Sequence, residues 1–257
     1  MENDFFRAII LGIVQGLTEF LPVSSTAHLI LFPWFFGWRG QVDTLAFDVA
    51  LHGGTLLALL VCFYRDWVHL FLNDRRMLAY ILAGIVPAGA AGILLNKHIE
   101  STLRNPLLII FTLIGFGVLM VMAERLSRKS RECVSMSDSL FVGVAQAIAL
   151  VPGVSRSGIT ITAGLFKDLT RESAARFSFL LSTPVVAGAV LLEGRKLVAS
   201  PEVYHFDIIL TGIIASFVSG YLAIRFLLGF LKRHPLHVFV YYRFALAAII
   251  GVWWLRQ

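Results

Sequence analysis

Two charged residues of this sequence lie inside apolar segments, where a charge is costly. Glu19 follows an apolar run that begins at Phe5, and Arg156 lies in a second apolar region, residues 139–166. A charge at bilayer depth costs roughly 2.5 to 3.5 kcal/mol on insertion scales, so it persists mainly where function requires it. Both residues are therefore candidates for a functional site.

The spacing around Glu19 predicts a helix that carries a pair of polar side chains and a pair of glycines. Gln15 and Glu19 are four residues apart, so their side chains share a helix face. Gly12 and Gly16 are also four residues apart, which would let another backbone approach closely. We expect this helix to pack tightly against a neighbour and to present two polar groups to a site.

The first polar break, residues 21–26, has the composition of a helix end followed by a helix start. Its proline ends one helix, and Ser24 or Ser25 would cap the next. Thr26 and His28 then lie in the first turn of the returning helix.

The second break, residues 151–158, has the same design. Ser155 would open a returning helix beside Arg156, and Ser157 and Thr160 follow. Where two helix starts converge, free N–H groups and positive dipole ends face one another. With a guanidinium and several hydroxyls, they form a site suited to a phosphate or pyrophosphate. One carboxylate there also suggests a divalent metal ion shared with the anion.

Each of these residues also has a plainer explanation. A serine or threonine in a membrane helix is often a link between helices, a lone histidine is more often structural, and Glu19 could pair with Arg156 only to neutralise it. We favour the functional interpretation because the residues gather at two related breaks. Outside the breaks we favour the plainer one.

Four polar positions lie within other apolar stretches. We expect Arg225 and Arg243 to extend their side chains toward the cytoplasmic side of the membrane. Asp48 and His52, four residues apart near the end of an apolar stretch, are open to both interpretations.

The composition places these residues in a membrane protein. Of 257 residues, 58% are hydrophobic and only 15% are charged, and the mean hydropathy is +0.80. So little charge cannot cover a soluble surface, which excludes an ordinary soluble domain, a disordered chain and a nucleic-acid binder with a basic surface. The net charge of +6 fits basic residues gathered in cytoplasmic loops.

Six apolar stretches are long enough to cross a bilayer, which takes about 20 residues. The interrupted regions break into halves that are too short to span, so we expect two re-entrant hairpins with turns near the midplane; a kinked single span is the alternative. We predict an all-α polytopic membrane protein with six transmembrane helices plus two re-entrant helical hairpins. The six stretches are residues 44–64, 77–95, 106–123, 176–192, 208–230 and 238–255, and the two hairpin regions are residues 5–37 and 139–166.

The chain also resembles itself at an offset of 131 residues. The pattern Gly12-x-x-Gln recurs at Gly143, within internal repeats of about 1–125 and about 136–257. Each repeat would hold one hairpin and three spans, and an odd number of spans inverts the second repeat relative to the first. We therefore predict one membrane domain, residues 1–257, built as an inverted-topology repeat.

Loop charges predict the orientation in the membrane. Twelve Lys and Arg residues lie in the connectors on one side and seven on the other. The richer side should be cytoplasmic, which turns both termini outward. The seven outer residues are Arg7, Arg39, Lys97, Arg104, Arg195, Lys196 and Arg256.

Both breaks resemble motifs of one bacterial family. The stretch Gln15-Gly-Leu-Thr-Glu-Phe-Leu-Pro-Val-Ser-Ser-Thr-Ala-His28 looks like the first motif of the bacterial undecaprenyl-pyrophosphate phosphatases, the bacitracin-resistance family. Pro152-Gly-Val-Ser-Arg-Ser-Gly158, followed by Thr160, looks like their second motif. The resemblance covers essentially the whole chain in order and spacing, and two long motifs are specific.

The resemblance implies a multi-pass enzyme of the bacterial inner membrane. It would hydrolyse undecaprenyl pyrophosphate to undecaprenyl phosphate and inorganic phosphate, which recycles the lipid carrier for cell-wall synthesis and confers bacitracin resistance. A divalent cation, Mg²⁺ or Ca²⁺, and an active site toward the periplasmic, outer face are implied too. Its partners would be the polyprenyl pyrophosphate lipid and the bilayer, without nucleic acid, and a homodimer is left open.

Carried over by position, the resemblance assigns catalysis to Glu19, Ser25, His28 and Arg156. We expect Ser25 to be the nucleophile and His28 the general base or acid; a His28 nucleophile and a water activated by His28 are the alternatives. Glu19 would hold the metal ion with Gln15, which stands where the family motif can carry a second carboxylate. Phosphate contacts are expected from Ser24, Thr26, Ser155, Arg156, Ser157 and Thr160.

A transporter or flippase of a phosphorylated lipid or an anion is the competing hypothesis. Inverted repeats, polar breaks at the midplane and helix N-termini that face an anion are common in transporters. Ser25 and His28 near Arg156 favour chemistry, because anion binding alone needs neither a nucleophile nor a base.

Overall fold

The computed structural model describes residues 2–102, 105–199 and 205–256, with side chains except at 2, 3, 45, 95–102, 193 and 195–199. Within these ranges the regular structure is helical, apart from one isolated bridge between Arg131 and Leu169. The helices are α1 (Glu2–Phe20), α2 (Ser25–Phe36), η1 (Gln41–Asp43), α3 (Leu45–Cys62), α4 (Tyr64–Leu72), α5 (Arg75–Thr102), α6 (Pro106–Leu126), α7 (Met136–Ile148), α8 (Arg156–Phe166), α9 (Arg171–Ala199), α10 (Phe206–Leu231) and α11 (His237–Trp254).

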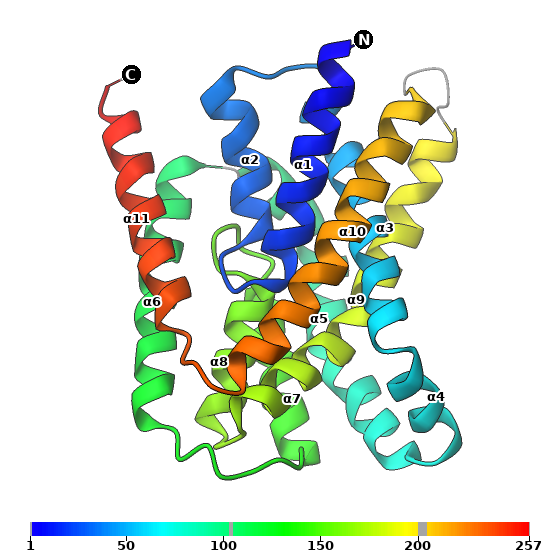
Figure 1. Ribbon diagram of the computed structural model, residues 1–257, viewed down its shortest axis with the longest axis vertical. Helices are drawn as coiled ribbons and strands as arrows, with labels where there is room; N and C mark the ends of the chain where they lie inside the picture. Colours follow the sequence, from blue (N-terminus) through cyan, green and yellow to red (C-terminus); the bar gives the residue numbers. More distant parts are fainter. Residues whose placement is uncertain (1, 103–104, 200–204, 257) are drawn as a thin grey trace.

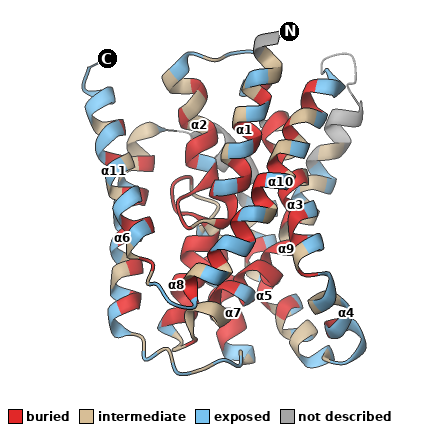
Figure 2. Ribbon diagram, in the orientation of Figure 1, coloured by how far each residue is buried: buried red, intermediate tan, exposed pale blue. Residues whose placement is uncertain are grey.

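In the described part of the chain, five helices are long and apolar enough to cross a membrane, namely α5, α6, α9, α10 and α11. The sixth expected span falls on α3, which joins α4 at a bend of 63°; the pair satisfies the same criteria taken together. Large apolar side chains point outward along the spans, as at Val86, Phe111 and Leu222. Figure 2 shows these exposed faces turned away from a buried centre. The prediction of an all-helical membrane protein is confirmed.

Each of the two interrupted regions forms a helical hairpin rather than a kinked span; α1, with 19 residues, is longer than the expected half. In Figure 1, α2 returns toward the end of the molecule where α1 began, and α8 returns toward the end where α7 began. The two turns lie side by side in the middle of the bundle, where the Ser157 hydroxyl donates to the carbonyl oxygen of Leu21 at 3.2 Å.

Both returning helices begin with the same kind of N-cap, a serine with a positive φ. Ser24 has a φ of 76°, and its hydroxyl accepts the N–H of Ala27 at 3.4 Å. Ser155 has a φ of 72°, and its hydroxyl accepts the N–H of Gly158 at 3.2 Å. A serine cap satisfies a backbone donor that the helix itself leaves unpaired. The two caps are 131 residues apart, the offset of the sequence repeat.

Small residues let the first helix of each hairpin pack closely on a spanning helix. A β-carbon on Gly12 would lie 2.5 Å from the carbonyl oxygen of Gly212, so α1 and α10 are in close backbone contact there. A β-carbon on Gly16 would meet α10 as well, and one on Gly143 of α7 would overlap the carbonyl of Gly84 in α5. The expectation that Gly12 and Gly16 admit another backbone is confirmed.

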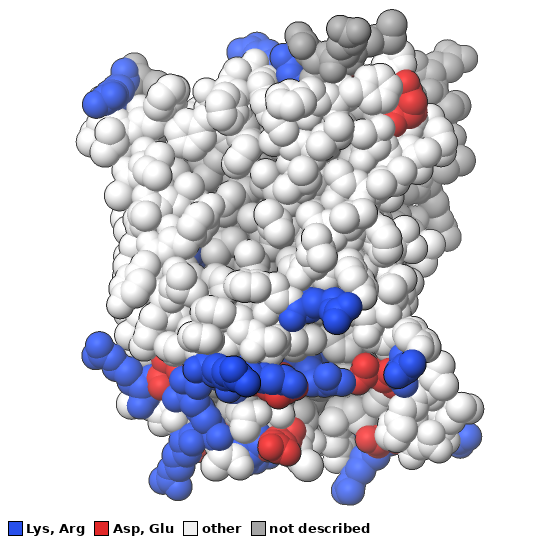
Figure 3. Space-filling view, in the orientation of Figure 1, with Lys and Arg blue, Asp and Glu red and all other residues white. Residues whose placement is uncertain are grey.

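Basic side chains gather at one end of the molecule. Figure 3 shows a band of Lys and Arg near the end opposite the two termini, and most of the face above the band carries no charge. Figure 1 places both termini at the other end. Four of the residues counted for that other side have side chains outside the described residues: Lys97, Arg104, Arg195 and Lys196.

Candidate active site

A cavity of about 180 Å³ lies where the two turns meet. Residues from both hairpins, from α3 and from α9 line it, so it exists only in the folded bundle. The lining residues are Thr18, Glu19, Ser24, Ser25, Thr26, His52, Ala149, Ser155, Arg156, Val185, Val186 and Ala189.

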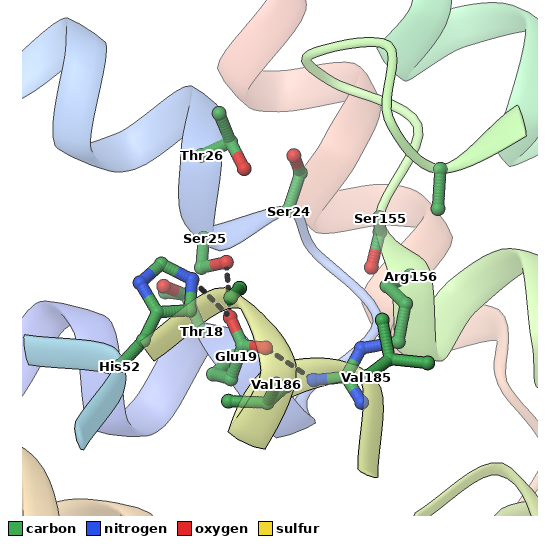
Figure 4. Close-up of a pocket in the computed structure, with 12 residues that line it drawn as sticks. Thr18, Glu19, Ser24, Ser25, Thr26, His52, Ser155, Arg156, Val185 and Val186 are labelled. Carbon is green, nitrogen blue, oxygen red and sulfur yellow. Dashed lines mark hydrogen bonds and ion pairs between the residues drawn. The ribbon is translucent and has the colours of Figure 1, made fainter. Parts of the chain in front are cut away.

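Glu19 is the centre of the polar network in this cavity (Figure 4). Its Oε2 accepts hydrogen bonds from the Ser25 hydroxyl at 2.6 Å and from Nε2 of Gln15 at 3.1 Å. Its Oε1 forms an ion pair with Nη2 of Arg156. One carboxylate therefore holds a hydroxyl from the first hairpin and a guanidinium from the second.

A histidine from α3 completes this network. Nε2 of His52 lies 3.6 Å from Oε2 of Glu19. Nδ1 of the same ring lies 2.8 Å from the carbonyl oxygen of Asp48, one turn earlier, which acts as the acceptor for Nδ1–H. Nε2 is therefore the nitrogen that faces the cavity and the carboxylate.

Two residues that contact Glu19 each have a buried polar atom with no hydrogen-bond partner among the described residues. These atoms are Nη1 of Arg156, a donor, and Oε1 of Gln15, an acceptor. Buried polar groups in folded proteins are usually hydrogen-bonded, so these two atoms are suited to bind a ligand. An anion with oxygen acceptors would satisfy Arg156, and a cation would satisfy Gln15.

The donor set fits a hard divalent cation that is shared with a substrate. Glu19 and Gln15 offer carboxylate and amide oxygens, the ligand type that Mg²⁺ and Ca²⁺ prefer. Within the described part of the chain, no group of three or more His, Cys, Asp or Glu side chains could hold a metal alone. A cation bound there would complete its coordination with other oxygens, from water or from the substrate.

The chain is similar to known proteins over nearly its whole length. The family model for bacitracin resistance protein BacA matches residues 8–249. The chain belongs to the BacA family. A protein named undecaprenyl-diphosphatase from Thermodesulfovibrio yellowstonii is 53% identical over 96% of this chain and 96% of its own length. Proteins with the same name from Moorella thermoacetica and Rubrobacter xylanophilus are 46% and 45% identical, over 98% and 96% of this chain and 98% and 97% of their own.

In this BacA-family chain, the residues expected at the site divide into two groups in space. Six of the residues expected at the site line the cavity: Glu19, Ser24, Ser25, Thr26, Ser155 and Arg156. Gln15 is not a lining residue, but its side chain donates a hydrogen bond to Glu19. Ser157 and Thr160 are not among the lining residues. The Ser157 hydroxyl bonds to the first turn, and the Thr160 hydroxyl lies 2.6 Å from that of Ser178 in α9. Both hydroxyls therefore link structural elements in this arrangement.

His28 is also outside the cavity lining of this BacA-family chain. Its Nδ1 lies 2.7 Å from the carbonyl oxygen of Ser24, and its Nε2 lies 2.7 Å from the Tyr242 hydroxyl. Both ring nitrogens are thus occupied by α2 and α11 rather than by Ser25. The general acid–base role assigned to His28 stays a prediction, and the geometry gives the ring a positioning contact.

Sequence reasoning missed two residues of the region. The sequence leaves the role of His52 open, and its only signal is the spacing of four residues from Asp48. Arg243 was expected to extend to the cytoplasmic side, which is wrong: its side chain is fully buried and points into the bundle. The reason is that Arg243 lies on the face of α11 that packs inward, where backbone carbonyls are available to it.

Proposed function

We propose that this chain is an undecaprenyl-diphosphatase. It hydrolyses undecaprenyl pyrophosphate to undecaprenyl phosphate and inorganic phosphate, which recycles the lipid carrier for cell-wall synthesis and confers bacitracin resistance. The observation that carries the proposal is the Glu19 carboxylate held between the Ser25 hydroxyl and the Arg156 guanidinium in a buried cavity. The name shared by its relatives supports the choice of substrate.

The terminal phosphate binds where the two hairpins converge. Arg156 offers its unpaired Nη1, and Ser155 offers a hydroxyl beside it. The N-termini of α2 and α8 add backbone N–H groups and the positive ends of two helix dipoles. In a cavity walled by Val185 and Val186 these charges act with little screening, so they favour the negative charge that spreads over a phosphoryl group in transfer.

Ser25 is the nucleophile in this proposal. Its oxygen attacks the terminal phosphorus as its proton passes to Oε2 of Glu19, and the bond from phosphorus to the bridging oxygen breaks. Undecaprenyl phosphate leaves with that electron pair. Water then attacks the phosphoserine, Glu19 returns the proton to the serine oxygen as the P–O bond breaks, and both protons of the water leave with inorganic phosphate.

The contacts of Glu19 favour this carboxylate over His28 as the base. The Ser25 hydroxyl already donates to Glu19, whereas His28 is hydrogen-bonded to Ser24 and Tyr242. A His28 nucleophile and direct attack by water are the competing mechanisms, and trapping of a phosphoenzyme separates all three.

A divalent cation, Mg²⁺ or Ca²⁺, is part of the proposal. Glu19 and Gln15 would hold it through their side-chain oxygens, as the unpaired Oε1 of Gln15 supports. When bound, the cation neutralises charge on the pyrophosphate oxygens.

The membrane setting follows from the distribution of charge. The end with the basic band faces the cytoplasm and the termini face outward, since Lys and Arg accumulate in cytoplasmic loops. We place the active site toward the periplasmic, outer face of the inner membrane. The polyprenyl tail stays in the surrounding lipid, so the cavity needs to enclose only the headgroup.

The architecture supports an inverted repeat of about 1–125 and about 136–257. The caps at Ser24 and Ser155 are alike in φ and in hydrogen bonding. The packing is reciprocal as well: α1 lies against α10 through Gly12, and α7 lies against α5 through Gly143. Such exchange between halves is expected of two repeats related by a pseudo-two-fold axis.

Transport of a phosphorylated lipid or anion is the second candidate, favoured by that same pairing of two hairpins. A direct assay decides between them. Purified protein in detergent is given a polyprenyl pyrophosphate with Mg²⁺, Ca²⁺ or EDTA, beside Arg156→Ala, and released phosphate is measured. Metal-dependent release that the variant loses supports the phosphatase. Folded protein that binds the lipid but releases no phosphate with any divalent metal rejects it in favour of transport.

A further inference from the structure

Arg243 of α11 is a buried cation in the middle of the membrane domain. It is fully buried among the described residues. Its guanidinium donates five hydrogen bonds, and every acceptor is a backbone carbonyl oxygen. The acceptors are Leu113 (from Nε, 3.2 Å), Pro22 (Nη1, 3.4 Å), Val154 (Nη1, 3.1 Å), Thr112 (Nη2, 3.2 Å) and Gly153 (Nη2, 2.8 Å).

These five carbonyls belong to three different segments. Pro22 lies in the first turn, Gly153 and Val154 lie in the second, and the other two acceptors are in α6. One side chain thus joins both turns to each other and to a spanning helix. The next residues along the chain after these turns are the ones that line the cavity, Ser24 and Ser155.

The chemistry of this contact requires arginine. A guanidinium has five N–H donors in a planar fork, and all five are used here, whereas a lysine has three donors on one atom. None of the ion pairs within the described chain includes Arg243. Its charge is therefore offset by carbonyl dipoles rather than by a carboxylate.

The neighbouring residue of α11 strengthens the arrangement. The Tyr242 hydroxyl lies 2.7 Å from Nε2 of His28, whose Nδ1 reaches the carbonyl oxygen of Ser24. Two consecutive residues of α11 thus hold the start of α2. Arg243 binds the turn that precedes it, and Tyr242 binds His28. The helix α6, which Arg243 also contacts, is joined to the second turn independently. The hydroxyl of Thr112 in α6 donates a 2.8 Å hydrogen bond to the carbonyl oxygen of Pro152.

We propose that Arg243 is a positioning residue of the active site: it fixes the first turn relative to the second, and so fixes Ser25 relative to Arg156. It touches neither substrate nor reacting atoms. Ser25 directly follows the cap of one helix and Arg156 directly follows the cap of the other, so the separation of the two turns sets the distance from nucleophile to phosphate clamp. This proposal rests on the phosphatase function proposed above.

The test compares Arg243→Met, which keeps the length and removes every donor, with Arg243→Lys, which keeps the charge and at most three donors. The matched control is Arg225→Met, because Arg225 is exposed on α10 and hydrogen-bonded only to Tyr221 among the described residues. The variants are purified in detergent, and kcat and KM for phosphate release are measured per folded protein.

We expect Arg243→Met to lower kcat about 100-fold with KM changed less than about fivefold, since displacement of reacting groups by about 1 Å can cost that much. Arg243→Lys should recover part of the loss, and Arg225→Met should match the wild type. Wild-type kcat in Arg243→Met, or a loss that only follows the folded fraction, overturns the proposal. If Arg243→Met does not fold, a wild-type kcat in folded Arg243→Lys overturns the proposal. If neither variant folds, Arg243 is a folding determinant only, and the proposal is overturned as well.

A second measurement does not depend on catalysis. Spin labels at Phe36→Cys in α2 and Ile148→Cys in α7, both exposed positions outside the cavity lining, report the separation of the two hairpins once Cys62 and Cys133 are replaced by alanine. A single narrow distance that broadens or shifts in Arg243→Met supports the positioning role. An unchanged distance refutes it, even if the wild type proves to have no phosphatase activity.

Discussion

Removal of Arg156 should destabilise the fold through Glu19 as well as stop turnover. In the pair, the Glu19 side chain is only 6% exposed and that of Arg156 is 16% exposed. Loss of one partner of a buried ion pair costs about 3–5 kcal/mol, because the other charge stays buried alone. The Glu19 carboxylate keeps its hydrogen bonds from Ser25 and Gln15 in the variant, so we expect about 3 kcal/mol, the lower end of this range, for Arg156→Met.

The double variant Glu19→Gln with Arg156→Met separates stability from catalysis. It removes both charges, so at least about 2 kcal/mol of the stability lost in Arg156→Met should return. Activity should not return. Each single variant should lower kcat at least about 100-fold, the scale of losing one main electrostatic group, and the double should be no better than either.

Two assays on the same detergent-purified samples measure these effects. A loss of about 3 kcal/mol corresponds to a fall in Tm of about 6–12 °C for a chain of this size class. Phosphate release from a polyprenyl pyrophosphate with Mg²⁺ reports turnover. Arg225→Met serves as the control, since it removes an exposed arginine and should change neither quantity.

Two results would refute the reasoning. If the double variant is no more stable than Arg156→Met, an unpaired Glu19 charge is not the cause of the instability. If either single variant keeps activity within threefold of the wild type, the site is not where the two hairpins meet.

Further variants test the site and the packing. Ser25→Ala should lower turnover about 1000-fold or more and abolish a trapped phosphoenzyme; phosphate found on His28 in the wild type would contradict the mechanism. Gly16→Val should lower Tm by several degrees because its side chain meets α10, whereas Gly89→Val, with open space around it, should not; equal Tm values would show that the α1–α10 contact adapts. Ser155→Ala removes a helix cap and should cost about 1 kcal/mol of stability, so an unchanged Tm would argue against the cap. EDTA should lower phosphate release at least about tenfold, with recovery on addition of Mg²⁺ or Ca²⁺; full activity in EDTA would exclude a role for the cation.

Much of the fold could be predicted from the sequence because its determinants are local. The length of an apolar stretch decides whether a helix can cross the bilayer, and five of six expected spans coincide with long apolar helices. The turns could be located for the same reason, since proline ends a helix and Ser24 and Ser155 cap the next within three residues. Many of the residues that line the candidate cavity could be predicted as well, because its main polar residues adjoin those caps.

The tertiary structure alone decided which side chains meet. The amino-acid order is enough to identify Glu19 and Arg156 as costly charges near polar breaks, but it does not reveal that His52 rather than His28 faces the carboxylate. It also could not tell that Arg243 turns inward to both breaks. Those contacts join residues 33 to 221 positions apart in the chain, and helix packing, which the spacing within one helix does not encode, determines them.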